Sequence, residues 1–134
     1  MAAVLVLEDD PSVGTTLCTM LTLAGFTTHC ARTVDDALAI LGNERVDAVS
    51  LDVVVPDPKG LERSGLSLLG MLRTTPDYAS LPVLIFTGMP LSVEEEEAVR
   101  ELKASVFYKP QPYSVIIQHL THELRASSLT RAAG

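Results

Sequence analysis

The sequence predicts one domain of the α/β class, in which a five-stranded parallel sheet carries five helices on its two faces. Two observations lead to this prediction. Short runs rich in Val, Leu, Ile, Phe and Thr recur five times, and stretches with helical spacing of apolar residues separate them. Strands that alternate with helices in this way pair in parallel through right-handed crossovers. The length of 134 residues is enough for one domain with its own core.

The expected strands are apolar to different degrees. They are Ala3–Leu7, Phe26–Ala31, Asp47–Leu51, Pro82–Phe86 and Ser105–Tyr108. Three of them are nearly continuous apolar runs, which is typical of central strands covered on both faces.

The expected helices show buried stripes and recognisable first residues. Their stripes consist of Leu17, Met20, Leu21 and Ala24; Ala37, Leu38 and Leu41; Leu68, Leu69 and Leu72; Val99 and Leu102; and Ile117, Leu120 and Leu124. Asp10 precedes a proline at a helix start, and Thr33 and Ser92 each open a motif similar to a capping box. Residues 127–134 lack such a pattern. We therefore expect a domain over residues 1–126, then a short flexible tail, and no output domain.

Charge and composition exclude several classes of function. The formal net charge of −7 disfavours a nucleic-acid partner, because phosphate binding needs a basic surface. No apolar stretch approaches the ~20 residues of a membrane span, and the N-terminus lacks the basic region of a signal peptide. We expect a cytoplasmic protein without a membrane partner. In a reducing compartment, Cys18 and Cys30 are expected to be buried free thiols, with a disulfide as the alternative.

Polar side chains follow the ends of the expected strands. Glu8 and Asp9 follow the first strand, Asp52 the third, Thr87 the fourth and Lys109 the fifth. Ligands of open α/β sheets bind at this edge. The charges sum to −3 + 1 = −2 there, and a divalent cation would remove the repulsion between the carboxylates. Oxygen donors without His or Cys favour Mg²⁺ over zinc.

These residue types suit phosphoryl transfer. A carboxylate beside Mg²⁺ can attack phosphorus and form an aspartyl phosphate. The Lys109 ammonium would neutralise charge on the phosphoryl group, and the Thr87 hydroxyl would donate to one of its oxygens. The residues alone therefore predict Asp52 as a phosphoryl acceptor.

Four segments form a specific pattern because they occur in order, each at the end of an expected strand. They are Val4–Pro11, Leu51–Pro56, Leu84–Pro90 and Phe107–Pro110. The pattern resembles the receiver domain of two-component response regulators, of the stand-alone type similar to chemotaxis regulators. The resemblance covers nearly the whole chain and implies a flavodoxin-like, doubly wound sheet with strand order 2-1-3-4-5.

The resemblance also implies a metal site. Mg²⁺, with Mn²⁺ as a substitute, would be the cofactor. Asp9 and Asp52 would be direct ligands, Glu8 a ligand or a holder through water, and the backbone carbonyl of Val54 would complete the metal sphere.

By the same resemblance, Asp52 would take a phosphoryl group from the phosphohistidine of a histidine kinase or a histidine phosphotransfer protein. Thr87 and Lys109 would bind that group, and the movement of Thr87 toward it would start a conformational switch. A downstream protein would dock on the fourth helix, the fifth strand and the fifth helix. The chain would catalyse only its own phosphorylation and slow dephosphorylation, so it is not expected to be an enzyme. Val54 and Met89 flank the acceptor with side chains that cannot position a water, which predicts slow hydrolysis.

The chain departs from the family pattern at three places. Glu8 stands where Asp is usual. The switch aromatic, three residues before the lysine, is replaced by Val106; strand alternation sends Phe107 to the opposite face, while Tyr108 shares the face of Val106. The loop over residues 57–65 carries about five more residues than the family's turn, either as a tolerated insertion or as a segment that orders on phosphorylation or partner binding.

Two other functions compete with this reading. Val106 supports a phosphorylation-independent scaffold that keeps the fold without the switch. A Mg²⁺-dependent phosphatase of the haloacid-dehalogenase type would use Asp52 as nucleophile, but it needs a second acid where this chain has Val54. The intact acidic residues oppose the first alternative, and Val54 opposes the second.

Two further groups of polar residues lie on the expected helices. His119 and His122 are expected to be solvated rather than to bind metal. Glu94–Glu97 fall in the first turn of a helix, where the helix dipole favours them, and an acidic recognition face is the alternative.

Overall fold

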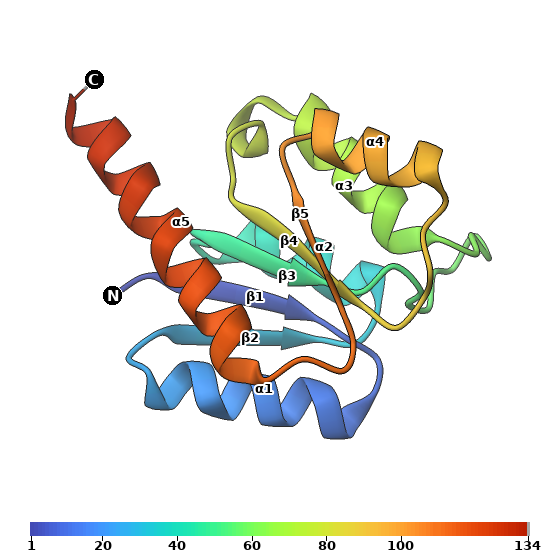
Figure 1. The fold of residues 1–134 in the computed structure, drawn as a ribbon, viewed down its shortest axis with the longest axis horizontal. Helices are drawn as coiled ribbons and strands as arrows, with labels where there is room; N and C mark the ends of the chain where they lie inside the picture. The colour runs from blue at the N-terminus through green and yellow to red at the C-terminus, as the bar shows by residue number, and fades with distance from the viewer. Residues whose placement is uncertain (134) are drawn as a thin grey trace.

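Five parallel strands form one sheet in the order β2-β1-β3-β4-β5 (Figure 1). The structure, a computed structural model, describes residues 1–133, with side chains as far as residue 127. The strands are β1 (Ala3–Leu7), β2 (Thr27–Ala31), β3 (Ala48–Leu51), β4 (Val83–Thr87) and β5 (Ser105–Tyr108). All arrows in Figure 1 point to the same edge of the sheet, so the carboxyl ends of the strands lie together. The expected flavodoxin-like strand order is confirmed, and the expected strand bounds differ by one residue at several ends.

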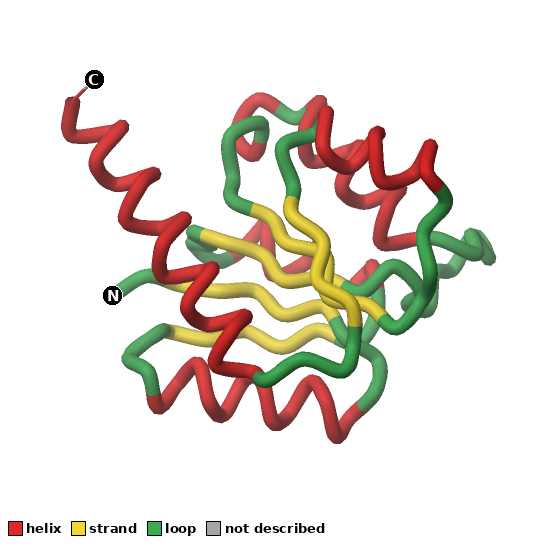
Figure 2. Tube along the Cα trace, in the orientation of Figure 1, coloured by secondary structure: helices red, strands yellow, loops and turns green. Residues whose placement is uncertain are grey.

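Helices cover both faces of the sheet (Figure 2). One face carries α1 (Pro11–Leu23) and α5 (Tyr113–Ala133); the other carries α2 (Val34–Asn43), α3 (Ser64–Thr74) and α4 (Val93–Glu101). A short 3₁₀ helix, η1 (Pro76–Tyr78), precedes β4.

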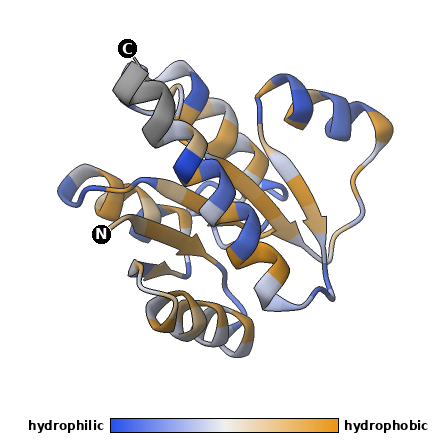
Figure 3. Cartoon of the chain, turned by 60° about the vertical axis from the view of Figure 1, so that its left-hand side comes forward, coloured by the Kyte–Doolittle hydropathy of each residue, from blue (hydrophilic) through white to orange (hydrophobic). Residues whose placement is uncertain are grey.

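The sheet divides the core into two clusters. Leu5, Leu7 and Ile85 belong to the cluster under α2, α3 and α4. Val4 and Leu84 belong to the cluster under α1 and α5. Every residue of β1, β3 and β4 is buried, as expected for central strands, and Figure 3 shows these strands coloured mainly as hydrophobic.

The predicted helix caps are present. The Asp10 side chain accepts a hydrogen bond from the backbone amide of Ser12 (3.0 Å), and the Thr33 hydroxyl accepts one from the amide of Asp36 (3.1 Å). Ser92 forms a complete capping box at the start of α4. Local residue types therefore determine where these helices begin.

Two expectations differ from the structure. Cys18 and Cys30 form a disulfide, so the prediction of two free thiols is wrong, and Cys30 is exposed rather than buried. The physical reason is the packing of α1 beside β2, which brings the two Cα atoms to 6.8 Å, within bonding range for a disulfide. In the segment expected as a tail, α5 continues as far as Ala133, while the expected flexibility of this segment stays a prediction; Gly134 lies outside the described residues.

Among the described residues, no helix combines the length and the apolar character that crossing a lipid bilayer requires.

Candidate functional site

The sheet brings the predicted site residues together at the carboxyl ends of β1, β3, β4 and β5. Glu8 is 6% exposed, Asp52 is 9% exposed and Thr87 is fully buried, whereas Asp9 is exposed. Lys109 lies directly after β5 and is half-buried. Three polar side chains are thus withdrawn from bulk water around one opening, and such burial has a cost unless the groups pair with one another.

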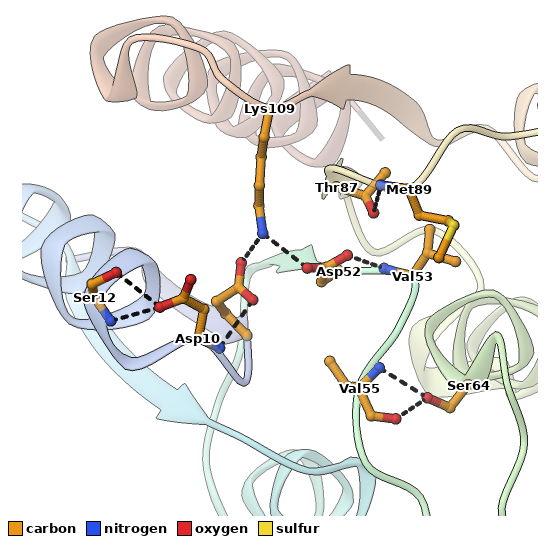
Figure 4. A network of polar contacts seen from close by, with 10 residues as sticks. Asp10, Ser12, Asp52, Val53, Val55, Ser64, Thr87, Met89 and Lys109 are labelled. Atoms are coloured by element: carbon orange, nitrogen blue, oxygen red, sulfur yellow. Dashed lines mark hydrogen bonds and ion pairs between the residues drawn. The ribbon is translucent and has the colours of Figure 1, made fainter.

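Lys109 supplies that pairing (Figure 4). Its ammonium donates a hydrogen bond to Oδ2 of Asp52 at 2.9 Å and forms a close ion pair with Oε1 of Glu8. Burial would lower the pKa of Lys109, but its hydrogen bonds to Glu8 and Asp52 outweigh burial, so the pKa is raised. Lys109 therefore remains a cation between two carboxylates.

The pKa of Glu8 is shifted by the same neighbours, but here burial is the largest effect. Burial raises its pKa, the nearby charge of Asp52 raises it further, and the hydrogen bond from Lys109 counteracts both. Burial and the charge of Asp52 together outweigh the hydrogen bond, so the pKa of Glu8 is raised. The longer side chain at this position still reaches the site, since its second oxygen also accepts a hydrogen bond from the amide of Asp10 at 3.3 Å.

The carboxylate of Asp52 is held by the backbone around it. Oδ1 of Asp52 accepts a hydrogen bond from the amide of Val53 at 2.7 Å, so each carboxylate oxygen has a defined partner. Gly65 in the first turn of α3 donates its amide to the carbonyl of Val53 at 2.9 Å. A Cβ atom at Gly65 would lie 2.0 Å from the carbonyl oxygen of Asp52, so only glycine permits this approach.

Thr87 ends β4 with its hydroxyl oriented into the following loop. Oγ1 of Thr87 accepts a hydrogen bond from the amide of Met89 at 3.1 Å (Figure 4). The hydroxyl hydrogen remains available to donate to a ligand oxygen. Val54 and Met89 lie in the loops that follow β3 and β4, and each is 39% exposed.

The site fits a hard divalent cation. Glu8, Asp9 and Asp52 each offer a carboxylate oxygen, and these atoms lie within 4.8 Å of one another. Carboxylate oxygens are the ligands that Mg²⁺ prefers, so the donor set fits the oxygen preference of that ion.

Three interactions near the site were not predicted from the sequence. Arg63 forms an ion pair with Glu95 at 3.0 Å and thereby connects the long loop before α3 to the first turn of α4. The Tyr108 hydroxyl donates a hydrogen bond to Glu96, also on α4. The close approach of Gly65 is the third. Only Gly65 had a signal in the sequence, a glycine at the start of an expected helix.

The expected solvation of the two histidines holds for His122, which is exposed, but is wrong for His119. The ring of His119 packs edge-on against Phe107, with 5.0 Å between ring centres, because α5 crosses β5 at this point. Phe107 belongs with the cluster under α1 and α5, whereas Val106 packs with the opposite cluster, as strand alternation predicts.

Comparison with known proteins identifies the family. Residues 4–121 match the response regulator receiver domain, and the chain belongs to this family of two-component signalling domains. The response regulator MprA of Mycobacterium sp. (strain KMS) is 34% identical over 123 residues, which are 92% of this chain and 49% of the relative. MprA of Mycobacterium avium (strain 104) is 32% identical with the same coverage. The chain thus spans about half the length of these curated relatives.

Solved structures show the same architecture. A CheY-like receiver domain protein of Methanospirillum hungatei JF-1 has a TM-score of 0.83 at 20% identity, covering 97% of this chain and 98% of that one. The non-phosphorylated HemR receiver domain of Leptospira biflexa has a TM-score of 0.79 at 25% identity, covering 92% and 94%. These likenesses agree with the family match and with the observed strand order.

Proposed function

We propose that this receiver domain accepts a phosphoryl group on Asp52 from a phosphohistidine and that the modification alters its binding to a partner. The observation that carries the proposal is the position of Asp52, whose buried carboxylate lies beside Glu8 and 2.9 Å from the ammonium of Lys109. In the proposed reaction an oxygen of Asp52 forms a bond to phosphorus. The bond between phosphorus and the imidazole nitrogen breaks, and its electron pair stays on the imidazole.

The side chains of this chain have separate parts in that step. Lys109 neutralises negative charge on the transferred group and keeps the carboxylate of Asp52 oriented. Thr87 donates its hydroxyl hydrogen to a phosphoryl oxygen while it accepts from Met89. Val53 holds the second carboxylate oxygen through its amide. These contacts favour in-line positioning, which contributes much of the rate in phosphoryl transfer.

Mg²⁺ is the proposed cofactor, with Mn²⁺ as a substitute, and when bound it supplies positive charge that offsets the charge on the phosphoryl oxygens. Glu8, Asp9 and Asp52 would hold it, with the carbonyl of Val54 as a further ligand. The first three are supported by the grouping of their carboxylate oxygens within 4.8 Å.

The proposed partners follow from this chemistry. A histidine kinase or a histidine phosphotransfer protein would donate the phosphoryl group, and a downstream protein would bind the face made of α4, β5 and α5. We propose a cytoplasmic location for these exchanges. The chain would act on no other substrate, and its own dephosphorylation would be slow because Val54 and Met89, which flank the acceptor, offer no group that can activate water.

Intact-mass spectrometry tests the proposal. The wild-type protein and Asp52→Asn are incubated with phosphoramidate, once with Mg²⁺ and once with EDTA. The wild type should gain about 80 Da, the mass of one phosphoryl group, only in the presence of Mg²⁺. Asp52→Asn should gain nothing, whereas Asp77→Asn, at an exposed aspartate of η1, should behave like the wild type.

A donor panel of histidine kinases and phosphotransfer proteins extends the test to macromolecular donors. Uptake that survives Asp52→Asn would contradict the assignment of the acceptor. Absence of uptake from every donor would favour the phosphorylation-independent scaffold, which Val106 supports.

A further inference from the structure

The end of β5 carries two neighbouring side chains with partners on different elements. Lys109 reaches Asp52 and Glu8 at the acceptor site, and the hydroxyl of Tyr108 donates to the carboxylate of Glu96 on α4. These two residues are adjacent in the chain. A backbone displacement at one of them is therefore transmitted to the other.

The backbone links this segment to Thr87 as well. Thr87 and Tyr108 are register partners in the parallel pairing of β4 and β5, and the amide of Lys109 donates to the carbonyl of Thr87 at 2.8 Å. Thr87 and Lys109, the two residues proposed to contact the phosphoryl group, are therefore linked through backbone bonds to the segment that contains Tyr108. Val106 lies two residues earlier and has an apolar side chain that packs with the core under α2, α3 and α4.

α4 is weakly packed and therefore sensitive to such a link. Of its nine residues only Val99 is buried, so apolar packing holds this helix weakly. Polar contacts hold its first turn instead: the capping box of Ser92, the ion pair from Arg63 to Glu95 and the hydrogen bond from Tyr108 to Glu96. The bond from Tyr108 has a charged acceptor, which makes it stronger than a bond between neutral groups.

We propose that Tyr108 transmits the phosphorylation state of Asp52 to α4 through its hydrogen bond to Glu96. The inference rests on the proposed function, because it needs a phosphoryl group that changes the contacts of Lys109 and Thr87. When these residues turn toward the phosphoryl group, the end of β5 shifts with them and the Tyr108 hydroxyl changes its distance from Glu96. The first turn of α4 then loses or gains an anchor.

Hydrogen exchange of the α4 amides, measured by mass spectrometry with and without phosphoramidate and Mg²⁺, tests this link. In the wild type, phosphorylation should change exchange across residues 93–101. In Tyr108→Phe and in Glu96→Ala, this difference should shrink about threefold or more, because the hydrogen bond is missing in both states. Phosphoryl uptake at Asp52 should continue in both variants.

Matched variants separate this link from general effects of substitution. Tyr78→Phe removes another half-buried hydroxyl, one that donates to the carbonyl of Leu41 at 2.7 Å, and should keep the wild-type response. Glu97→Ala changes the exposed neighbour of Glu96 and should keep it as well.

The outcomes distinguish the two proposals. A wild-type α4 response in phosphorylated Tyr108→Phe and Glu96→Ala would overturn the role of Tyr108, as would unchanged α4 exchange in the phosphorylated wild type. If the wild type takes up no phosphoryl group from any donor, the proposed function fails and this inference fails with it. The mass of the intact protein identifies which of these results has occurred.

Discussion

Gly65→Ala is expected to damage both the stability and the acceptor activity of this domain. Gly65 lies in the first turn of α3, and a Cβ atom there would come within 2.0 Å of the carbonyl oxygen of Asp52 and 2.9 Å of Cα of Val53. Ordinary van der Waals contact begins at 3.4 Å, so the two segments must separate by about 1.4 Å. The obstructing atoms belong to the backbone, which cannot turn away as a flexible side chain can.

The separation affects more than one contact. It stretches the hydrogen bond from the amide of Gly65 to the carbonyl of Val53, now 2.9 Å long. It also disturbs the buried Ser64 hydroxyl, which donates to the carbonyl of Val55. Overpacking costs about 1–3 kcal/mol and each weakened hydrogen bond about 1 kcal/mol, so the free energy of unfolding should fall by about 3 kcal/mol or more.

Urea denaturation of Gly65→Ala and Gly70→Ala provides a comparison within one helix. A Cβ atom at Gly70 meets nothing within 4 Å, so alanine there should stabilise the domain by about 0.5–1 kcal/mol through its higher helix propensity. Phosphoramidate uptake should decrease in Gly65→Ala, since the displaced atoms belong to Asp52, and should be retained in Gly70→Ala. Equal stability of the two variants would refute the reasoning, because it would mean that α3 yields to the added methyl group without cost.

Three further predictions concern other side chains. Lys109→Gln should slow phosphoryl uptake by about a hundredfold in time-resolved mass spectrometry, while Lys59→Gln in the exposed loop should not; equal rates would contradict the role of Lys109. Arg73→Met should lower the free energy of unfolding, measured in urea, by about 2–4 kcal/mol. The reason is that the guanidinium donates to the carbonyls of Leu102 (2.6 Å), Tyr78 (3.1 Å) and Leu81 (2.7 Å). Arg73→Lys should recover only part of this loss, and full recovery would show that the several donors of the guanidinium are unnecessary. The hydrogen bond to Glu96 raises the pKa of Tyr108 above the ordinary 10.0, so this contact stabilises the fold below that pH and is lost as pH rises through the folded-state value. An ultraviolet titration should therefore contain a phenolate step above pH 10.0 that is missing in Tyr108→Phe, and its persistence in that variant would assign the step elsewhere.

The architecture and the grouping of polar side chains at one edge of the sheet could be predicted because both depend on local patterns. Continuous apolar runs identify central parallel strands, and parallel strands bring the residues at their carboxyl ends to one edge of the sheet. Glu8, Asp52 and Lys109 therefore meet in the structure as they do in the prediction. The order and direction of the strands alone bring these positions together.

Other contacts could not be predicted because they join elements whose relative positions depend on the folded chain. The ion pair of Arg63 with Glu95 depends on the path of a long loop, and the edge-on contact of His119 with Phe107 depends on where α5 crosses β5. The pairing of Cys18 with Cys30 was misjudged for a different reason. The prediction considered the redox compartment, whereas the geometry of α1 beside β2 decides whether the two residues can meet.

The contact at Gly65 also explains where the loop before α3 must lie. Because α3 begins against the backbone of Asp52, the loop between them cannot move the helix away from Asp52 without breaking that contact. The loop therefore turns outward into solvent. Its turn is stabilised by the Asp57 carboxylate, which accepts from the amide of Lys59 at 3.0 Å, and the chain returns so that Arg63 faces α4 and pairs with Glu95. The loop thus leaves the surroundings of Asp52 undisturbed and adds a contact to α4, the helix that Tyr108 also contacts. The first turn of α4 is consequently held both by the long loop, through Arg63, and by the end of β5, through Tyr108 beside the proposed acceptor site.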